Sequence, residues 1–278
     1  MPDKYEATWI SHSSIKDFKN CPRAYYLKNI YKNPETGRKI TLMNPHLALG
    51  QAVHNVLESL SNYSVEERFD RSLNEKLNQE WEKISGDQGG FKNKEQEQRF
   101  KKRAEEMIET IQSNPGPLNN LATKRNTELL KFWLSEEEEI ILCGMIDWFE
   151  FNENDKSVHI IDFKTGKKDK SNDDSLQLPI YYLLARECQK WDVSKLSYWF
   201  LQEDKQPESQ QIPDYIDSKK QILSIGKKIK NAREEKRFEC PNGENGCYHC
   251  QPLEKVLSGE AEQVGVDYDF NKDIFIVN

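Results

Sequence analysis

An aspartate and a lysine interrupt one apolar segment of the sequence, residues 160–166, which reads Ile-Ile-Asp-Phe-Lys-Thr-Gly. Alternate residues of a strand share a face, so Asp162 and Lys164 would point one way while their apolar neighbours enter a core. Asp147 interrupts the preceding apolar run, and pairing of the two strands would let both aspartates converge on one cation. Carboxylates bind magnesium or manganese, which activate water against a phosphate, and a lysine stabilises the developing charge. The pattern predicts phosphodiester hydrolysis, with an Asp–Lys pair on a solvated strand face as the alternative.

Two further pairs of polar residues have a spacing that suits such a site. His54 and Glu58 are four residues apart and therefore share one face of a helix, where a neutral imidazole is a plausible extra metal ligand. Gln177 and Tyr181 are also one helical turn apart, beside an apolar stripe. The alternatives are a histidine on a helix surface and an ordinary amphipathic boundary.

The elements that would position these residues follow from the periodicity of the apolar residues. After a capped helix that begins near Ser11, we expect helices over residues 49–60, 65–84, 92–112, 176–191 and 218–233. We expect strands over residues 127–134, 138–151, 157–164, 195–202 and 267–277, the first three as an antiparallel meander. This order of elements is typical of an α/β protein.

The composition excludes some classes of protein. Of the 278 residues, 36% are hydrophobic and 31% charged, and no apolar run approaches the roughly 20 residues that span a bilayer. Without a secretory signal at the start, we expect a cytoplasmic protein with no membrane contact. The net charge of −7 argues against a protein that coats nucleic acid with its whole surface, but a local basic stripe would suffice for phosphate contacts. Candidates for that stripe are Lys164, Lys167, Lys168, Lys170, Lys227, Lys228, Lys230 and Arg233.

The six cysteines are unevenly distributed. Cys240, Cys247 and Cys250 fall within eleven residues, and such clustering in a reducing cytoplasm indicates a metal site before it indicates disulfides. Cys143 and Cys188 lie in apolar patterns, and we expect them in the core.

Five short motifs occur in the order found in one nuclease family. In chain order they are Cys21-Pro22-Arg23-Ala24-Tyr25, Gly50 to His54 as Gly-x-x-x-His, Gly144 to Asp147 as Gly-x-Ile-Asp, Asp162 to Gly166 as Asp-x-Lys-Thr-Gly, and Gln177 to Tyr181 as Gln-x-x-x-Tyr. Together they resemble the RecB/AddB-type branch of the PD-(D/E)XK nuclease superfamily, which includes the small CRISPR-associated nucleases. The resemblance covers most of the chain.

The resemblance implies a fold. It is an α/β restriction-endonuclease-like core, with a mixed central sheet flanked by helices, in a single nuclease domain over residues 1–278. We expect a helical insertion at about residues 63–118 and a cysteine-stapled terminus at about residues 238–253.

The resemblance also implies roles for the site residues. His54, Asp147 and Asp162 would bind the catalytic magnesium or manganese, and Lys164 would act beside them. Gln177 and Tyr181 would help to place DNA and the catalytic groups. The implied substrate is DNA, single-stranded or at ends, in repair, recombination or DNA processing. The alternative is a catalytically silent DNA-binding or assembly subunit on the same fold.

A second cofactor is implied by the cysteines. In the iron–sulfur members of the branch, one N-terminal cysteine joins three C-terminal ones around a 4Fe–4S cluster, which points here to Cys21, Cys240, Cys247 and Cys250. In the familiar pattern a close pair of cysteines precedes a wider gap, whereas this chain has the wider gap first. A zinc site with four thiolates and a degenerate site with reduced thiols therefore stay open.

Overall fold

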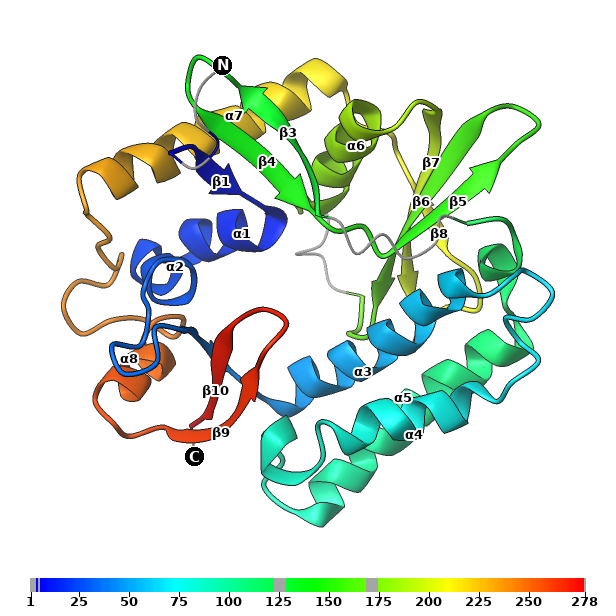
Figure 1. Cartoon of the computed structure of the whole chain (residues 1–278), viewed down its shortest axis with the longest axis horizontal. Helices are drawn as coiled ribbons and strands as arrows, with labels where there is room; N and C mark the ends of the chain where they lie inside the picture. The colour runs from blue at the N-terminus through cyan, green and yellow to red at the C-terminus, as the bar shows by residue number, and fades with distance from the viewer. Residues whose placement is uncertain (1–3, 5, 123–128, 169–174, 278) are drawn as a thin grey trace.

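Two sheets lie next to each other in the protein (Figure 1). The structure is a computed structural model, which describes residues 4, 6–122, 129–168 and 175–277. One sheet has the order β1-β4-β3 and the other β5-β6-β7-β8. β1 pairs with β4 and β6 pairs with β7 in parallel, and the remaining neighbours are antiparallel. The predicted mixed α/β architecture is thereby confirmed. The strands are β1 (Thr8–Ile10), β3 (Leu130–Ser135), β4 (Ile140–Gly144), β5 (Trp148–Asn152), β6 (Ser157–Lys164), β7 (Asp192–Phe200) and β8 (Glu208–Gln210).

The predicted three-stranded meander is wrong at its centre. The expected strand over residues 138–151 is two strands, β4 and β5, which belong to different sheets. The chain leaves β4 at Gly144, where a Cβ would lie 2.9 Å from Leu184 Cδ1 of the covering helix. Asp147 therefore lies in the crossing between two strands rather than on a strand. Of the predicted strand over residues 127–134, residues 127–128 lie outside the described part of the chain.

β6 is the most deeply buried strand, because helices cover both of its faces. Ile161 and Phe163 pack into a core with α3, α4 and α5, and Val158 and Ile160 pack into a second core with α6. The predicted division of β6 into two faces is correct, although both faces are buried. The helix on the second face is α6 (Gln177–Cys188). α7 (Tyr215–Glu234) packs against α6 and against the sheet β1-β4-β3, with α1 (His12–Asn20) and α2 (Pro22–Asn29) nearby.

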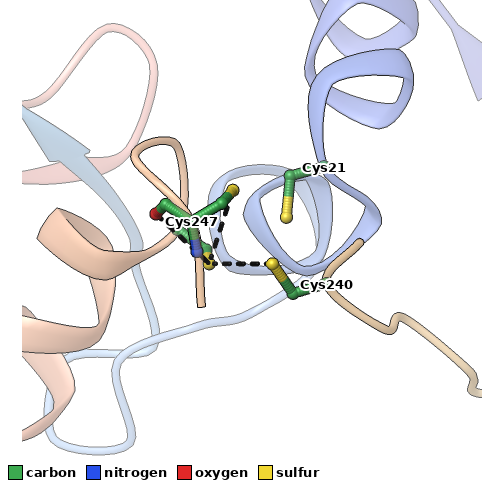
Figure 2. A group of neighbouring side chains, drawn as sticks. Cys21, Cys240 and Cys247 are labelled. Carbon is green, nitrogen blue, oxygen red and sulfur yellow. Dashed lines mark hydrogen bonds between the residues drawn. The ribbon is translucent and has the colours of Figure 1, made fainter. Parts of the chain in front are cut away.

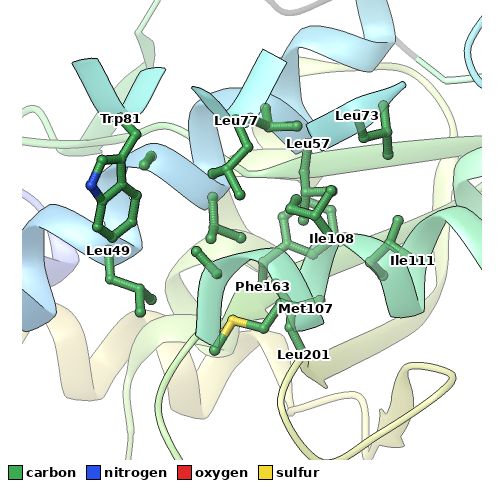
Figure 3. Packing of buried hydrophobic residues seen from close by; sticks show 14 of the residues in the cluster. Leu49, Leu57, Leu73, Leu77, Trp81, Met107, Ile108, Ile111, Phe163 and Leu201 are labelled. Carbon is green, nitrogen blue, oxygen red and sulfur yellow. The ribbon is translucent and has the colours of Figure 1, made fainter. Parts of the chain in front are cut away.

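α3 lies between β6 and a helical pair (Figures 1 and 3). Figure 3 shows Leu49 and Leu57 of α3 facing apolar side chains of α4 and α5 on one side and Phe163 on the other. Asn44 caps the N-terminus of α3 by accepting from two backbone N–H groups. The elements are α3 (Pro45–Ser59), α4 (Leu73–Glu82) and α5 (Lys94–Ser113). That residues 63–118 are an insertion into a single domain stays a prediction.

The C-terminal region forms a third sheet, not the single strand expected over residues 267–277. A hairpin of two strands pairs with a short strand from near the N-terminus, in the order β2-β10-β9. This sheet and α8 lie against α2, so a segment from the N-terminal part of the chain packs there against the C-terminal region. The elements are β2 (Lys39–Leu42), α8 (Gln251–Leu257), β9 (Glu262–Asp267) and β10 (Lys272–Ile276).

The predicted helix over residues 65–84 begins only at Leu73, because a buried arginine organises the preceding turns. Arg68 is 3% exposed, and its guanidinium donates to the carbonyls of Leu60, Leu118 and Asn120. It also lies 5.3 Å from the centre of the Trp148 ring at the start of β5. One side chain thus joins the end of α3, the segment after α5 and β5.

Replacing Arg68 by methionine should lower the free energy of unfolding by about 2–4 kcal/mol, because three carbonyls would lose their buried donor. The matched control is Arg71→Met at an exposed position, which should change stability by less than about 0.5 kcal/mol. Chemical denaturation measures both changes, and equal effects would contradict the role of Arg68.

Candidate functional site

Asp147 is held at the crossing between the two sheets by the backbone of β6. Its Oδ2 accepts a hydrogen bond of 2.9 Å from the N–H of Phe163. This contact places the carboxylate beside the end of β6 that carries Asp162 and Lys164. The two aspartates lie close enough for Asp162 to raise the pKa of Asp147, but through a crossing segment and not through two paired strands. That they share one cation stays a prediction.

His54 and Glu58 of α3 approach Asp147 from the opposite side. Nδ1 of His54 lies 3.5 Å from Asp147 Oδ2 and 3.7 Å from Glu58 Oε1. One ligand atom from each of the three residues lies within 4.8 Å of the others, a spacing that one cation can bridge. α3 comes close to β6 at this point, since a Cβ on Gly50 would lie 3.4 Å from Thr165 Oγ1.

Asp162 lies in a hydrogen-bonded chain on the side of β6 that faces α6. It is 1% exposed, and its Oδ2 lies 2.7 Å from the ammonium of Lys164. Gln177 donates from Nε2 to Asp162 Oδ1 at 2.6 Å and accepts from Lys164 through Oε1. Nε2 of Gln177 also lies 3.1 Å from the hydroxyl of Tyr181. His54, Asp147, Asp162, Lys164, Gln177 and Tyr181 thus lie close together, whereas the four predicted cysteine ligands lie elsewhere. The group of three possible ligands contains Glu58 and not Asp162, so the roles assigned to these residues stay a prediction.

The concentrated negative charge changes the protonation of the ligand groups. Burial and the nearby Asp162 carboxylate raise the pKa of Asp147 to about 7. Burial opposes the charged form of His54, but Asp147, Glu58 and Asp162 outweigh it and raise the pKa to about 9. Burial and the two aspartates raise the pKa of Tyr181 well above its usual value, so its hydroxyl stays protonated.

A cleft of about 1020 Å³ opens beside this group. Asp147, Glu58, Gln177 and Tyr181 contribute to its wall, as does the first turn of α1. In that turn, burial and the charges of Lys164 and Lys16 lower the pKa of His12 to about 4, so the imidazole is neutral near pH 7. Of the acidic group, Asp147 and Glu58 line this cleft.

The basic stripe expected from the sequence is only partly available. Lys168 contacts Asp204 and Glu208 at 2.9 and 3.0 Å. Lys227 contacts Glu138 at 2.5 Å, and Lys230 contacts Glu139 at 3.2 Å. These lysines are engaged with carboxylates of the protein, and Lys170 lies outside the described residues. Among the basic residues expected in the stripe, Lys164 lies beside the acidic group, where its ammonium contacts Asp162.

Four cysteines form a separate group that joins the N- and C-terminal parts of the chain (Figure 2). Cys21 caps α2, Cys240 and Cys247 lie in the segment after α7, and Cys250 precedes α8. The four sulfurs lie within 4.8 Å of one another, so the predicted gathering of these cysteines is confirmed. Of the two remaining cysteines, Cys143 is buried as expected, but Cys188 is half-buried at the end of α6, where the expectation of a core position is wrong.

Glu58 is the residue whose place in the site the sequence underestimated. Its separation of four residues from His54 was the available signal, but that spacing is common on exposed helix faces. Only the packing of α3 against the end of β6 turns this face toward Asp147.

None of the helices among the described residues is both long and apolar enough to cross a membrane.

Comparison with known protein families agrees with this geometry. The family model of the PD-(D/E)XK nuclease superfamily matches residues 9–253, which include both the acidic group and the four cysteines. No curated protein matches the chain. Since the match extends over most of the chain, this protein belongs to the PD-(D/E)XK nuclease superfamily.

Proposed function

We propose that this protein is a metal-dependent deoxyribonuclease whose active centre is the acidic group beside the cleft. The observation that carries the proposal is the meeting of His54, Glu58 and Asp147 next to the Asp162–Lys164 pair. Superfamily membership implies hydrolysis of phosphodiester bonds. The order of the five sequence motifs supports the RecB/AddB-type branch and, with it, DNA as the substrate.

The donor set fits a hard divalent cation. Two carboxylates and one imidazole with ligand atoms inside 4.8 Å suit magnesium or manganese, and Asp162 lies close enough to Asp147 to raise its pKa. When bound, the cation supplies an activated water and polarises the phosphate. His54, Glu58 and Asp147 would hold it, with Asp162 as the fourth candidate ligand.

Lys164 would stabilise the charge that develops on the phosphate oxygens. Asp162 and Gln177 fix its ammonium at the end of β6. Gln177 is itself positioned by Tyr181 on the next turn of α6. Because Tyr181 keeps its proton, its hydroxyl can donate a hydrogen bond to a substrate or to a neighbouring group.

Single-stranded DNA or a DNA end is the form of substrate that we propose, in repair, recombination or DNA processing. Carboxylates of the protein form ion pairs with several of the expected basic residues, so broad electrostatic binding to a duplex has little support. A catalytically silent DNA-binding or assembly subunit is the alternative function. The presence of His54, Asp147, Asp162 and Lys164 in one group favours the enzyme.

Substitution of Asp162 by asparagine or of Lys164 by alanine should reduce DNA cleavage by about 100-fold or more, because a ligand or the charge stabiliser is removed. The measurement is the digestion of end-labelled DNA with magnesium or manganese. Asp155→Asn and Lys205→Ala change exposed residues of the same types and should leave the rate unchanged. Wild-type rates in the first two variants, with intact folding, would refute the assignment.

Metal binding should weaken by at least about tenfold in His54→Ala and in Glu58→Gln, since each variant loses one of three clustered donors. A calorimetric titration with manganese gives the dissociation constants. In a cleavage assay, excess manganese should partly restore the activity of both variants. His46→Ala serves as the control, because His46 is exposed two turns earlier on α3. Unchanged manganese affinity in both site variants would show that His54 and Glu58 are ordinary residues of a helix surface and not metal ligands.

The affinity for manganese should rise as the pH rises from about 6 to about 9, because the metal competes with protons on its ligands. The raised pKa values of Asp147, about 7, and His54, about 9, set this window. Binding should release protons, which calorimetry detects as a heat that depends on the ionisation enthalpy of the buffer. A pH-independent affinity with no proton release would contradict the ligand set.

A further inference from the structure

We infer that the four cysteines bind a single zinc ion in tetrahedral geometry and that they do not hold the 4Fe–4S cluster implied by the resemblance to iron–sulfur nucleases. The inference rests on the distances between the sulfurs and is independent of the proposed nuclease activity. It concerns Cys21, Cys240, Cys247 and Cys250.

The sulfur spacing matches four ligands of one ion. Zinc binds thiolates at about 2.3 Å, and at the corners of a tetrahedron this bond length separates the sulfurs by about 3.8 Å. Cys250 Sγ lies 3.7 Å from Cys240 Sγ and 3.9 Å from Cys247 Sγ. Cys21 completes the group from the N-terminal side, as Figure 2 shows, and no pair of sulfurs is more than 4.8 Å apart.

A 4Fe–4S cluster requires a wider cage. Each of its four cysteines binds a different iron atom, so the width of the cluster holds the sulfurs roughly 6 Å or more apart. Every sulfur–sulfur distance here is shorter than that. Cys21 and Cys250 are fully buried, Cys240 is 5% exposed and Cys247 is half-buried, so a cluster would require the packing around the three buried sulfurs to change.

Backbone N–H groups point at three of the four sulfurs. The N–H of Ala24 donates to Cys21 Sγ at 3.4 Å, that of Asn242 to Cys240 Sγ at 3.4 Å, and that of Cys247 to Cys250 Sγ at 3.1 Å. Such donors offset the charge that thiolates retain around a divalent ion.

The cysteine segment has the tight turns that a single ion needs. Gly243 and Gly246 both have a positive φ, of 72° and 73°, which bends the chain back between Cys240 and Cys247. Arg23 holds this bend from α2, because its guanidinium donates to the carbonyls of Gly243 and Glu244 and to Glu254. The site is thus preformed by contacts outside the cysteines.

The ion would link a segment from the N-terminal part of the domain to one from its C-terminal part. Cys21 and Cys240 are separated by most of the chain, and a cross-link that closes a long loop restricts the unfolded state strongly. Cys21 also ends α1, whose first turn lines the cleft beside Asp147. The zinc would therefore stabilise the fold and hold one wall of the cleft, without taking part in hydrolysis.

The test measures metal content in the full-length Asp147→Asn variant, which removes a ligand of the acidic group and so limits zinc binding there. The protein is purified without oxygen from cells supplied with both iron and zinc. We expect one zinc per chain, no acid-labile sulfide, and no visible absorbance. Iron with acid-labile sulfide and the brown colour of a cluster would overturn the inference.

Cobalt provides a second readout that does not depend on what the cells supply. Reduced, metal-free protein titrated with cobalt should develop the intense visible bands of a tetrahedral tetrathiolate site at one equivalent, and zinc should abolish them. Absence of these bands would overturn the inference even if some zinc copurifies.

Two cysteine variants complete the design in the same background. Cys247→Ser should lose the zinc and lower the melting temperature by about 5 °C or more. Cys188→Ser, the half-buried control outside the group, should keep one zinc. Cys247→His is a second variant for the case in which Cys247→Ser does not fold. Three thiolates and an imidazole are a common zinc site, so the histidine can replace the thiolate as a ligand. It should keep the zinc, and its loss there with an intact fold would contradict the inference.

Discussion

The hydrogen bond from the backbone of Phe163 to the carboxylate of Asp147 is the contact on which the acidic group depends. The chain breaks between β4 and β5, and this bond fixes the crossing segment against the end of β6. His54 and Glu58 can then face Asp147 from α3, since Leu49, Leu57 and Phe163 pack in one core. Without that contact, a buried carboxylate with a raised pKa would have little to hold it in place.

Burial of β6 on both faces explains the second half of the site. Asp162 lies where solvent cannot stabilise its charge, so the protein supplies Lys164 and Gln177 as partners. The same arrangement holds the ammonium of Lys164 in a defined position. The pairing of Asp162 with Lys164 on one face of the strand therefore stabilises the buried charge and also places both groups for the proposed chemistry.

The sequence predicts the local parts of this site well. Alternation along residues 157–164 fixes the strand and the shared face of Asp162 and Lys164, and helical spacing joins Gln177 to Tyr181. Prediction from the sequence fails where tertiary packing determines the course of the chain. The continuous apolar run through residues 138–151 gives no sign that Gly144 packs against α6 and that the chain changes sheets there.

Two other errors have the same origin. Helical periodicity over residues 65–84 cannot reveal that Arg68 binds three distant carbonyls and delays the start of α4. The participation of Glu58 likewise depends on how α3 meets β6, which no local pattern encodes. For the cysteines, their number and order predict a shared site, but the distances between the sulfurs, on which the proposed single zinc ion rests, come only from the folded chain.

The nuclease activity is best tested by digestion of end-labelled single- and double-stranded DNA with the wild-type protein. We expect cleavage that requires magnesium or manganese, stops with a chelator, and favours single strands or ends. DNA that is bound but left intact by folded, metal-loaded protein would contradict the proposed nuclease and favour a silent DNA-binding subunit.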